Sequence, residues 1–124
     1  MVADSRGITS PEDLRRRTKK FALGIIRLFR GLPKTEQARI LGREALRAGT
    51  AVAANYRSAC FARSPADFIS KIGIIVEKAD ETAFWLALMA EAGIFKRAKL
   101  ESLLAEANEL VRIFQATRTT ARSR

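Results

Sequence analysis

The chain has 124 residues, a formal net charge of +10 and one cysteine, with 48% hydrophobic and 29% charged residues. This composition excludes an intrinsically disordered chain, and the length is typical of a single domain. Cys60 alone excludes an internal disulfide, and no segment is apolar enough for a signal peptide or a membrane span. We therefore expect one soluble cytoplasmic domain with no membrane association.

Helix start and stop signals divide the chain into four segments. The stretches SPEDL (10–14) and SPADF (64–68) each supply a serine N-cap, a proline at the first helical position and an acidic third residue. Gly31 and Gly93 are stop signals, and Thr35 is a further N-cap. These signals predict helices over residues 11–31, 35–63, 65–92 and 95–117, with flexible termini at 1–9 and 118–124.

Apolar residues recur with helical period in all four segments. In the first segment the apolar positions fall within an arc of roughly 60°, which is typical of a helix with one face on a core. Short connections make neighbouring helices antiparallel. The sequence therefore predicts an all-α, antiparallel up-down-up-down four-helix bundle spanning 1–124 as one domain. The predicted core of the first, second and fourth helices comprises Leu14, Phe21, Ile25, Leu28, Leu32, Ala38, Leu41, Ala45, Gly49, Val52, Tyr56, Ala59, Leu100, Leu103, Leu104, Ala107, Leu110, Val111 and Phe114. Gly42 and Gly49 are expected close-packing points.

The third segment is apolar on two sides. Beyond the inward stripe formed by Phe68, Ile72, Ile75, Val76, Ala79, Ala83, Leu86 and Ala90, four further residues project from the other side: Ile74, Phe84, Trp85 and Leu88. One bundle cannot bury both sides, and an exposed aromatic patch is typical of an interaction surface. We therefore expect a homo-oligomer with Phe84 and Trp85 as contact anchors. The alternative is a scatter of ordinary surface apolar residues.

Basic charge is concentrated in the first half of the chain. Residues 1–64 contain 14 Lys/Arg against 5 Asp/Glu, whereas residues 65–124 contain 9 against 8. This asymmetry indicates a polyanionic partner, most commonly nucleic acid. On two predicted helices the cations share arcs of roughly 100° and 80°. These candidate phosphate-binding residues are Arg16, Lys19, Lys20, Arg27, Arg30, Arg39, Arg43, Arg47 and Arg57.

Two alternative interpretations and one restriction on the ligand accompany this hypothesis. A basic ridge can also be an ordinary solvated helix face. The stretch 21–32 is amphipathic enough to favour a membrane surface, but its apolar residues are needed for the core. The ridges contain no aromatic stacking platform, so base-specific recognition of single strands is not expected.

The sequence contains few residues in patterns that support catalysis. The absence of histidine excludes Ser-His and Cys-His pairs and the Glu-x-x-His set of di-iron bundles. Glu77 and Glu81 lie one helical turn apart beside Asp80, and the three are more consistent with ion pairing to basic residues than with a metal or acid-base role. The glycines are dispersed, with no phosphate-binding loop. We expect no enzymatic activity, no cofactor and no metal.

A run of small residues that ends in ANYR (54–57) is followed by RS (63–64), by Phe68 and by EKADE (77–81), which leads to FWL (84–86). With these pieces, residues 14–95 resemble the bacterial 23S rRNA intervening-sequence proteins. The chain also distantly resembles the accessory protein of diversity-generating retroelements. In place of the commoner Glu-Gly after ANYR it has Ser58 and Ala59, which indicates a variant branch.

The resemblance implies an antiparallel four-helix bundle, similarity to homopentamers, and no established enzymatic activity. Its family members are often encoded within insertions of ribosomal RNA genes. The distant resemblance to the accessory protein of diversity-generating retroelements implies binding to nucleic acid and to a reverse transcriptase. The family signature positions are Asn55, Tyr56, Arg57, Arg63, Ser64, Phe68, Glu77 and Glu81. Among them we expect Asn55 and Glu77 to tie helices together through buried polar contacts.

Two functional hypotheses follow. In the first, a homo-oligomer, a pentamer by resemblance, displays its basic ridges and binds structured RNA or DNA through phosphate contacts. In the second, the oligomer is a scaffold for a protein partner, and its positive field only aids encounter.

Overall fold

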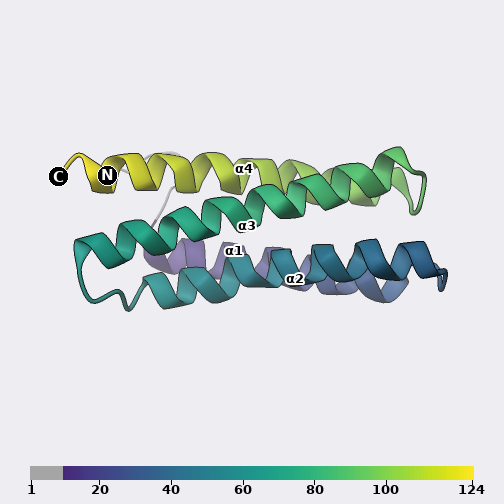
Figure 1. Cartoon of the computed structure of the whole chain (residues 1–124), viewed down its shortest axis with the longest axis horizontal. Coiled ribbons are helices and arrows are strands. Elements are labelled where there is room, and N and C mark those ends of the chain that lie inside the picture. The colour runs from purple at the N-terminus through teal and green to yellow at the C-terminus, as the bar shows by residue number, and fades with distance from the viewer. Residues whose placement is uncertain (1–9) are drawn as a thin grey trace.

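A computed structural model describes residues 10–124, so the predicted flexible segment 1–9 lies outside the described residues. It contains four helices, α1 (Pro11–Gly31), α2 (Glu36–Ala59), α3 (Pro65–Glu91) and α4 (Arg97–Arg122), and no strand in the described range. The helices run antiparallel in an up-down-up-down bundle (Figure 1). The predicted fold class is confirmed.

Three of the four helix starts follow from local side-chain chemistry. The side chains of Ser10, Thr35 and Ser64 each accept a hydrogen bond from the backbone N–H three residues later, at 3.0, 3.2 and 3.1 Å respectively. Pro11 and Pro65 occupy the first helical position, where no backbone donor is needed. Helix α4 begins after Lys96 without a side-chain cap.

The end of α2 differs from the prediction of residue 63. Helix α2 ends at Ala59 because the chain tightens there: the N–H groups of Phe61 and Ala62 bond to carbonyls three residues back. The N–H of Arg63 then donates to an Asp67 carboxylate oxygen at 3.1 Å. Ser64 precedes a proline, which disfavours the helical conformation at this position.

The end of α4 is also corrected, since the helix continues to Arg122 and not to residue 117. Its last two turns are not fully solvated: Arg118 and Ala121 are half-buried, and the Arg118 guanidinium lies close to Gly73 of α3. The helix therefore runs beyond the apolar pattern, with its last turns beside α3. Gly93, with a φ of 69°, ends the α3 region as predicted.

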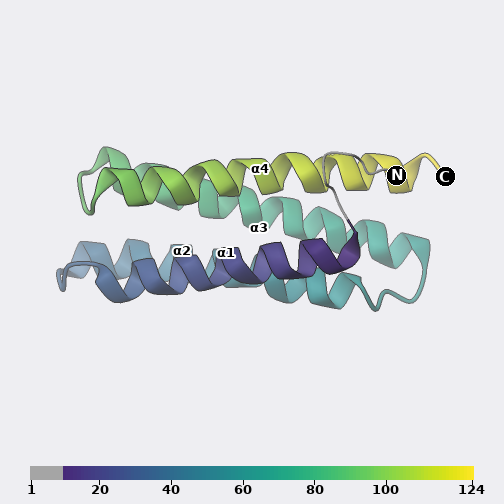
Figure 2. The ribbon, with the colours of Figure 1, turned by 180° about the vertical axis from the view of Figure 1, so that it is seen from behind.

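The bundle consists of two layers. Helices α1 and α2 form one pair and α3 and α4 the other, as both views of the ribbon show (Figures 1 and 2). The predicted stripes meet between the layers, where Ile25, Val52, Ile75 and Phe114 are fully buried. Within residues 10–124, no helix is long and apolar enough to cross a membrane.

Glycines of α2 set the spacing of the α1/α2 layer. A Cβ atom added at Gly42 would collide with Leu32, and one added at Gly49 would lie 2.9 Å from Cγ1 of Ile25. Both positions are therefore close-packing points, as predicted. The outer surfaces of α1 and α2 consequently lie side by side as one face of the molecule.

Candidate nucleic-acid interface

The basic ridges of α1 and α2 face solvent along their whole length. All nine predicted cations are exposed. Because α1 and α2 are antiparallel neighbours, the two ridges belong to one layer of the bundle (Figure 2). The fold therefore meets the condition that α1 and α2 be neighbours, while a single basic face and its binding role stay predictions.

One of the nine differs from the others in its ion pairs. The guanidinium of Arg16 lies 2.7 Å from Asp13 Oδ1 and 3.3 Å from Glu12 Oε2. The other eight make no ion pair within residues 10–124. We call these eight the cation face: Lys19, Lys20, Arg27, Arg30, Arg39, Arg43, Arg47 and Arg57.

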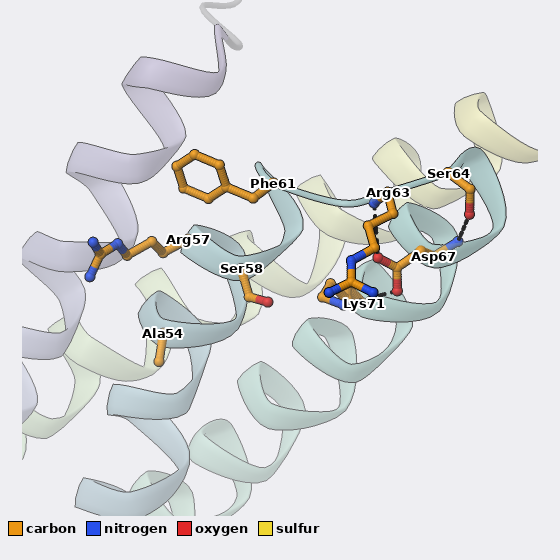
Figure 3. A pocket seen from close by; sticks show the side chains of 8 residues that line it. All are labelled: Ala54, Arg57, Ser58, Phe61, Arg63, Ser64, Asp67 and Lys71. Atoms are coloured by element: carbon orange, nitrogen blue, oxygen red, sulfur yellow. Dashed lines mark hydrogen bonds and ion pairs between the residues drawn. The ribbon is translucent and has the colours of Figure 1, made fainter.

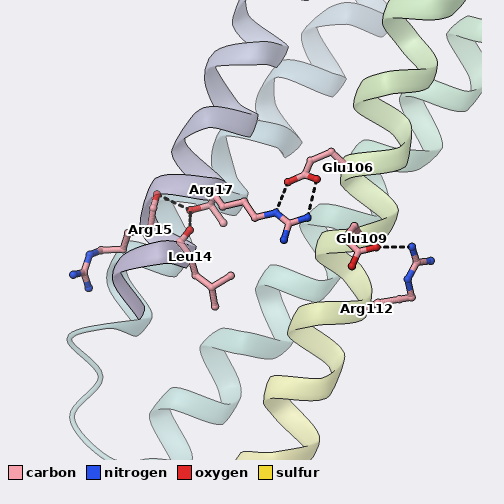
Figure 4. Close-up of polar contacts among 7 residues, drawn as sticks. Leu14, Arg15, Arg17, Glu106, Glu109 and Arg112 are labelled. Carbon is pink, nitrogen blue, oxygen red and sulfur yellow. Dashed lines mark hydrogen bonds and ion pairs between the residues drawn. The ribbon is translucent and has the colours of Figure 1, made fainter. Parts of the chain in front are cut away.

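Two further arginines of α1 point sideways toward neighbouring helices. The Arg17 guanidinium donates two hydrogen bonds to the carboxylate of Glu106 on α4, from Nε to Oε2 at 2.7 Å and from Nη2 to Oε1 at 2.9 Å (Figure 4). This bond raises the pKa of Arg17 against the opposing effect of its burial. Arg15 donates to Sγ of Cys60 at 3.4 Å. Arg15 and Arg17 therefore make contacts within the fold and are not counted in the cation face.

A small hollow of about 200 Å³ marks one end of the cation face, at the turn between α1 and α2. It brings Lys34 beside two members of the face. Its lining residues are Phe29, Arg30, Leu32, Pro33, Lys34 and Arg39.

The signature residue Asn55 does not tie helices together. It is half-buried, and its Nδ2 donates to the carbonyl of Ala51 in its own helix at 2.8 Å. This hydrogen bond stays within α2, which corrects the expected interhelical contact. The neighbouring Tyr56 does bridge helices: its ring packs on Phe114 of α4 with centroids 5.3 Å apart, and burial raises the pKa of its hydroxyl.

Glu77 also departs from expectation, because it is exposed and makes no ion pair within residues 10–124. Glu81 is exposed and pairs with Lys78 of its own helix at 3.3 Å. In the described range, no group of three acidic or cysteine side chains is arranged to hold a metal ion.

The second apolar side of α3 is exposed in part. Ile74, Phe84 and Leu88 are 39%, 56% and 37% exposed. Trp85 is only half-buried: it packs against the core, and its ring meets the edge of Phe84 with centroids 5.0 Å apart. Phe84 is therefore the most accessible of the predicted anchors, and an interface role for the four residues stays a prediction.

The remaining signature positions gather where α2 leads into α3. Ser64 caps α3, Phe68 packs against the core, and Arg57 and Arg63 are exposed. Sequence reasoning overlooked Phe61 in this region, although it is 75% exposed. The available signal was its position, which lies outside the apolar stripe of the second helix.

A small, basic, all-helical bundle with one cationic layer is thus the class of protein that the fold and the charges define. The family model for the 23S rRNA-intervening sequence protein matches residues 13–116. The chain belongs to this family. Comparison with curated proteins finds no match.

A solved structure supports the assignment. It is described as a protein of unknown function from the S23 ribosomal protein family of Bacteroides thetaiotaomicron. The two chains share 28% identity with a TM-score of 0.82, and the match covers 90% of this chain and 99% of the other.

Proposed function

We propose that this protein is a non-enzymatic homo-oligomer that binds structured RNA or DNA through phosphate contacts. The observation that carries the proposal is the cation face: eight exposed Lys and Arg side chains in one layer, with no carboxylate partner within residues 10–124. Unpaired surface cations release the counterions of a phosphate backbone when they bind it, which favours association. Six of the eight are arginines, whose planar fork suits phosphate oxygens.

The family name, which refers to 23S rRNA, supports a setting close to ribosomal RNA. The α3/α4 layer has no comparable excess of positive charge, because residues 65–124 are almost balanced in charge. A polyanion approaching the protein would therefore be drawn to the α1/α2 layer.

Self-association is the second part of the proposal. Three of the six large apolar side chains that are exposed within residues 10–124 lie on α3. If sister chains cover this surface, the cation face stays outward and is multiplied in the assembly. Five copies is the number that the family resemblance implies.

Light scattering across a range of protein concentrations tests the assembly. Phe84→Ala removes the most exposed anchor, and Trp85→Ala removes the half-buried ring beside it. We expect both to shift the mass toward the monomer. Leu23→Ala on α1, where the side chain is 42% exposed, is the matched control that should leave the mass unchanged. A monomeric wild-type protein would refute this part.

Binding is tested by titrating a blunt RNA hairpin and a DNA duplex at several salt concentrations. The log of the association constant falls with the log of salt by about 0.9 per phosphate contact on duplex DNA. Replacing Arg39, Arg43 and Arg47 together by Gln should therefore lower the slope by about 2.7 if all three contact phosphates. Circular dichroism should show an intact bundle, because all three side chains are exposed.

The matched control removes the same charge from the other layer, by replacing Lys99, Arg112 and Arg122 by Gln. These side chains are exposed on α4. We expect the slope to change by less than about 1. Equal effects of the two triple variants would show that only net charge matters and would contradict a defined interface. No binding near physiological salt would refute the proposal and favour a scaffold for a protein partner.

A further inference from the structure

A surface hollow of about 720 Å³ lies where α2 leads into α3 (Figure 3). Its size is within the range of ligand sites in proteins. It adjoins the cation face, because Arg57 belongs to both. The residues that line it are Ala54, Arg57, Ser58, Phe61, Arg63, Ser64, Asp67 and Lys71.

Phe61 is the most exposed large apolar side chain within residues 10–124, at 75%. It follows the end of α2, where its N–H bonds to the carbonyl of Ser58 at 3.0 Å. The ring at the rim of the hollow (Figure 3) therefore contributes little to the stability of the fold. Most of its surface is therefore open to a ligand.

The charges around the hollow are unbalanced in favour of cations. Asp67 is the one acidic residue of the lining, and its carboxylate is occupied by Lys71 Nζ at 2.9 Å and by the N–H of Arg63 at 3.1 Å. The guanidinium groups of Arg57 and Arg63 are exposed and make no ion pair within residues 10–124. Two free guanidinium groups thus accompany the exposed ring.

We propose that this hollow binds an unpaired nucleotide, with its base stacked on Phe61 and its phosphates held by Arg57 and Arg63. An aromatic platform combined with cations that follow the backbone is how proteins bind single-stranded nucleic acid without reading its sequence. A base inside a duplex cannot offer its face, so the favoured ligand is a helix that carries an overhang or a bulge. The duplex part lies on the cation face, and the inference therefore rests on the proposed function.

The two parts of this arrangement are separable by experiment. Fluorescence anisotropy compares a blunt RNA hairpin, whose strands are joined by a non-nucleotide linker so that it has no unpaired base, with the same hairpin bearing a short unpaired 3′ overhang, at a fixed near-physiological salt concentration. We expect the hairpin with the overhang to bind about 5-fold more tightly, or more, than the blunt hairpin, because this is the effect of stacking one base on an aromatic ring. Phe61→Ala and Phe61→Leu should remove this preference and leave the affinity for the blunt hairpin unchanged. Phe61→Trp should retain it, and the added indole emission should be quenched by the overhang alone.

Two controls identify the cause. Phe61→Leu keeps an apolar side chain but lacks an aromatic face, so its loss of preference separates stacking from general apolar contact. Ile40→Ala removes an exposed apolar side chain of α2, 47% exposed, and should leave the preference intact.

Several results would overturn the inference. Equal affinity for the two hairpins, or a preference that survives Phe61→Ala, would refute the nucleotide site and leave the proposed function standing. A lower oligomeric mass for Phe61→Ala in light scattering would show instead that a sister chain covers the ring. If neither hairpin binds, both the site and the proposed function fail.

Discussion

The close approach of α1 and α2 depends on Gly49, and Gly49→Ala is the sharpest test of this packing. The new Cβ would lie 2.9 Å from Cγ1 of Ile25 and 3.4 Å from its Cβ and Cγ2. Ile25 is fully buried and branched at Cβ, and such a side chain strongly prefers one rotamer in a helix. The contact is relieved only when α1 moves away from α2.

The magnitude follows from two opposing effects. Overpacking a buried site costs about 1–3 kcal/mol of unfolding free energy, whereas alanine in place of glycine inside a helix stabilises by about 0.5–1 kcal/mol. The net expectation for Gly49→Ala is a loss of about 1 kcal/mol. For a chain of this length that corresponds to a fall in Tm of roughly 3–6 °C.

Gly73→Ala is the matched control within the same protein. Its Cβ would lie 3.2 Å from Nη1 of Arg118, the far end of a flexible side chain that can shift. Only the helix effect then remains, and we expect a gain of about 0.5–1 kcal/mol.

Urea denaturation and thermal melts followed by circular dichroism, at one protein concentration, measure both variants. The two substitutions should differ in sign. If Gly49→Ala stabilises the protein as much as Gly73→Ala does, α1 and α2 are not in tight contact, and the spacing that places both basic ridges on one face is wrong.

Two further predictions concern single polar contacts. Replacing Arg17 by Gln should lower the free energy of unfolding, measured by urea denaturation, by about 0.5–1 kcal/mol, because the ion pair with Glu106 is bidentate but both side chains are partly solvated. In a protein that already carries Glu106→Gln, the same replacement should lower it by almost nothing further. The hydrogen bond from Lys71, followed by that from the N–H of Arg63, lowers the pKa of Asp67. Its stabilising effect is therefore present above its unfolded pKa of about 4 and is lost as the pH falls below that value. Wild-type protein should lose more stability than Asp67→Asn between pH 5 and pH 2.

The helix starts and the core were predictable from sequence because their causes are local or periodic. Ser10, Thr35 and Ser64 act on backbone groups three residues away, so no knowledge of the tertiary structure is needed. The core stripes depend only on the period of the helix. Gly42 and Gly49 were identifiable for the same reason, since a small residue on an inward stripe marks a close approach.

The contacts of polar side chains were not predictable, because they depend on the register between neighbouring helices. Asn55 donates to a carbonyl of its own helix and not to another helix. Arg17 and Arg16 are adjacent in sequence, yet one meets Glu106 of α4 and the other meets carboxylates one turn away. The last turns of α4 were missed because the apolar pattern ends before them, although the helix continues to Arg122.

The spacing of Arg39, Arg43 and Arg47 bears on what the cation face is for. Residues four apart on a helix lie on the same side, and each like-charged pair at this spacing destabilises a helix by about 0.2–0.5 kcal/mol. None of the three has a carboxylate partner within residues 10–124 to offset the repulsion. Helix α2 is held instead by its opposite side, where Ala45 and Val52 are fully buried. The arginine row therefore costs the fold stability, and a polyanion that binds along it would relieve the repulsion.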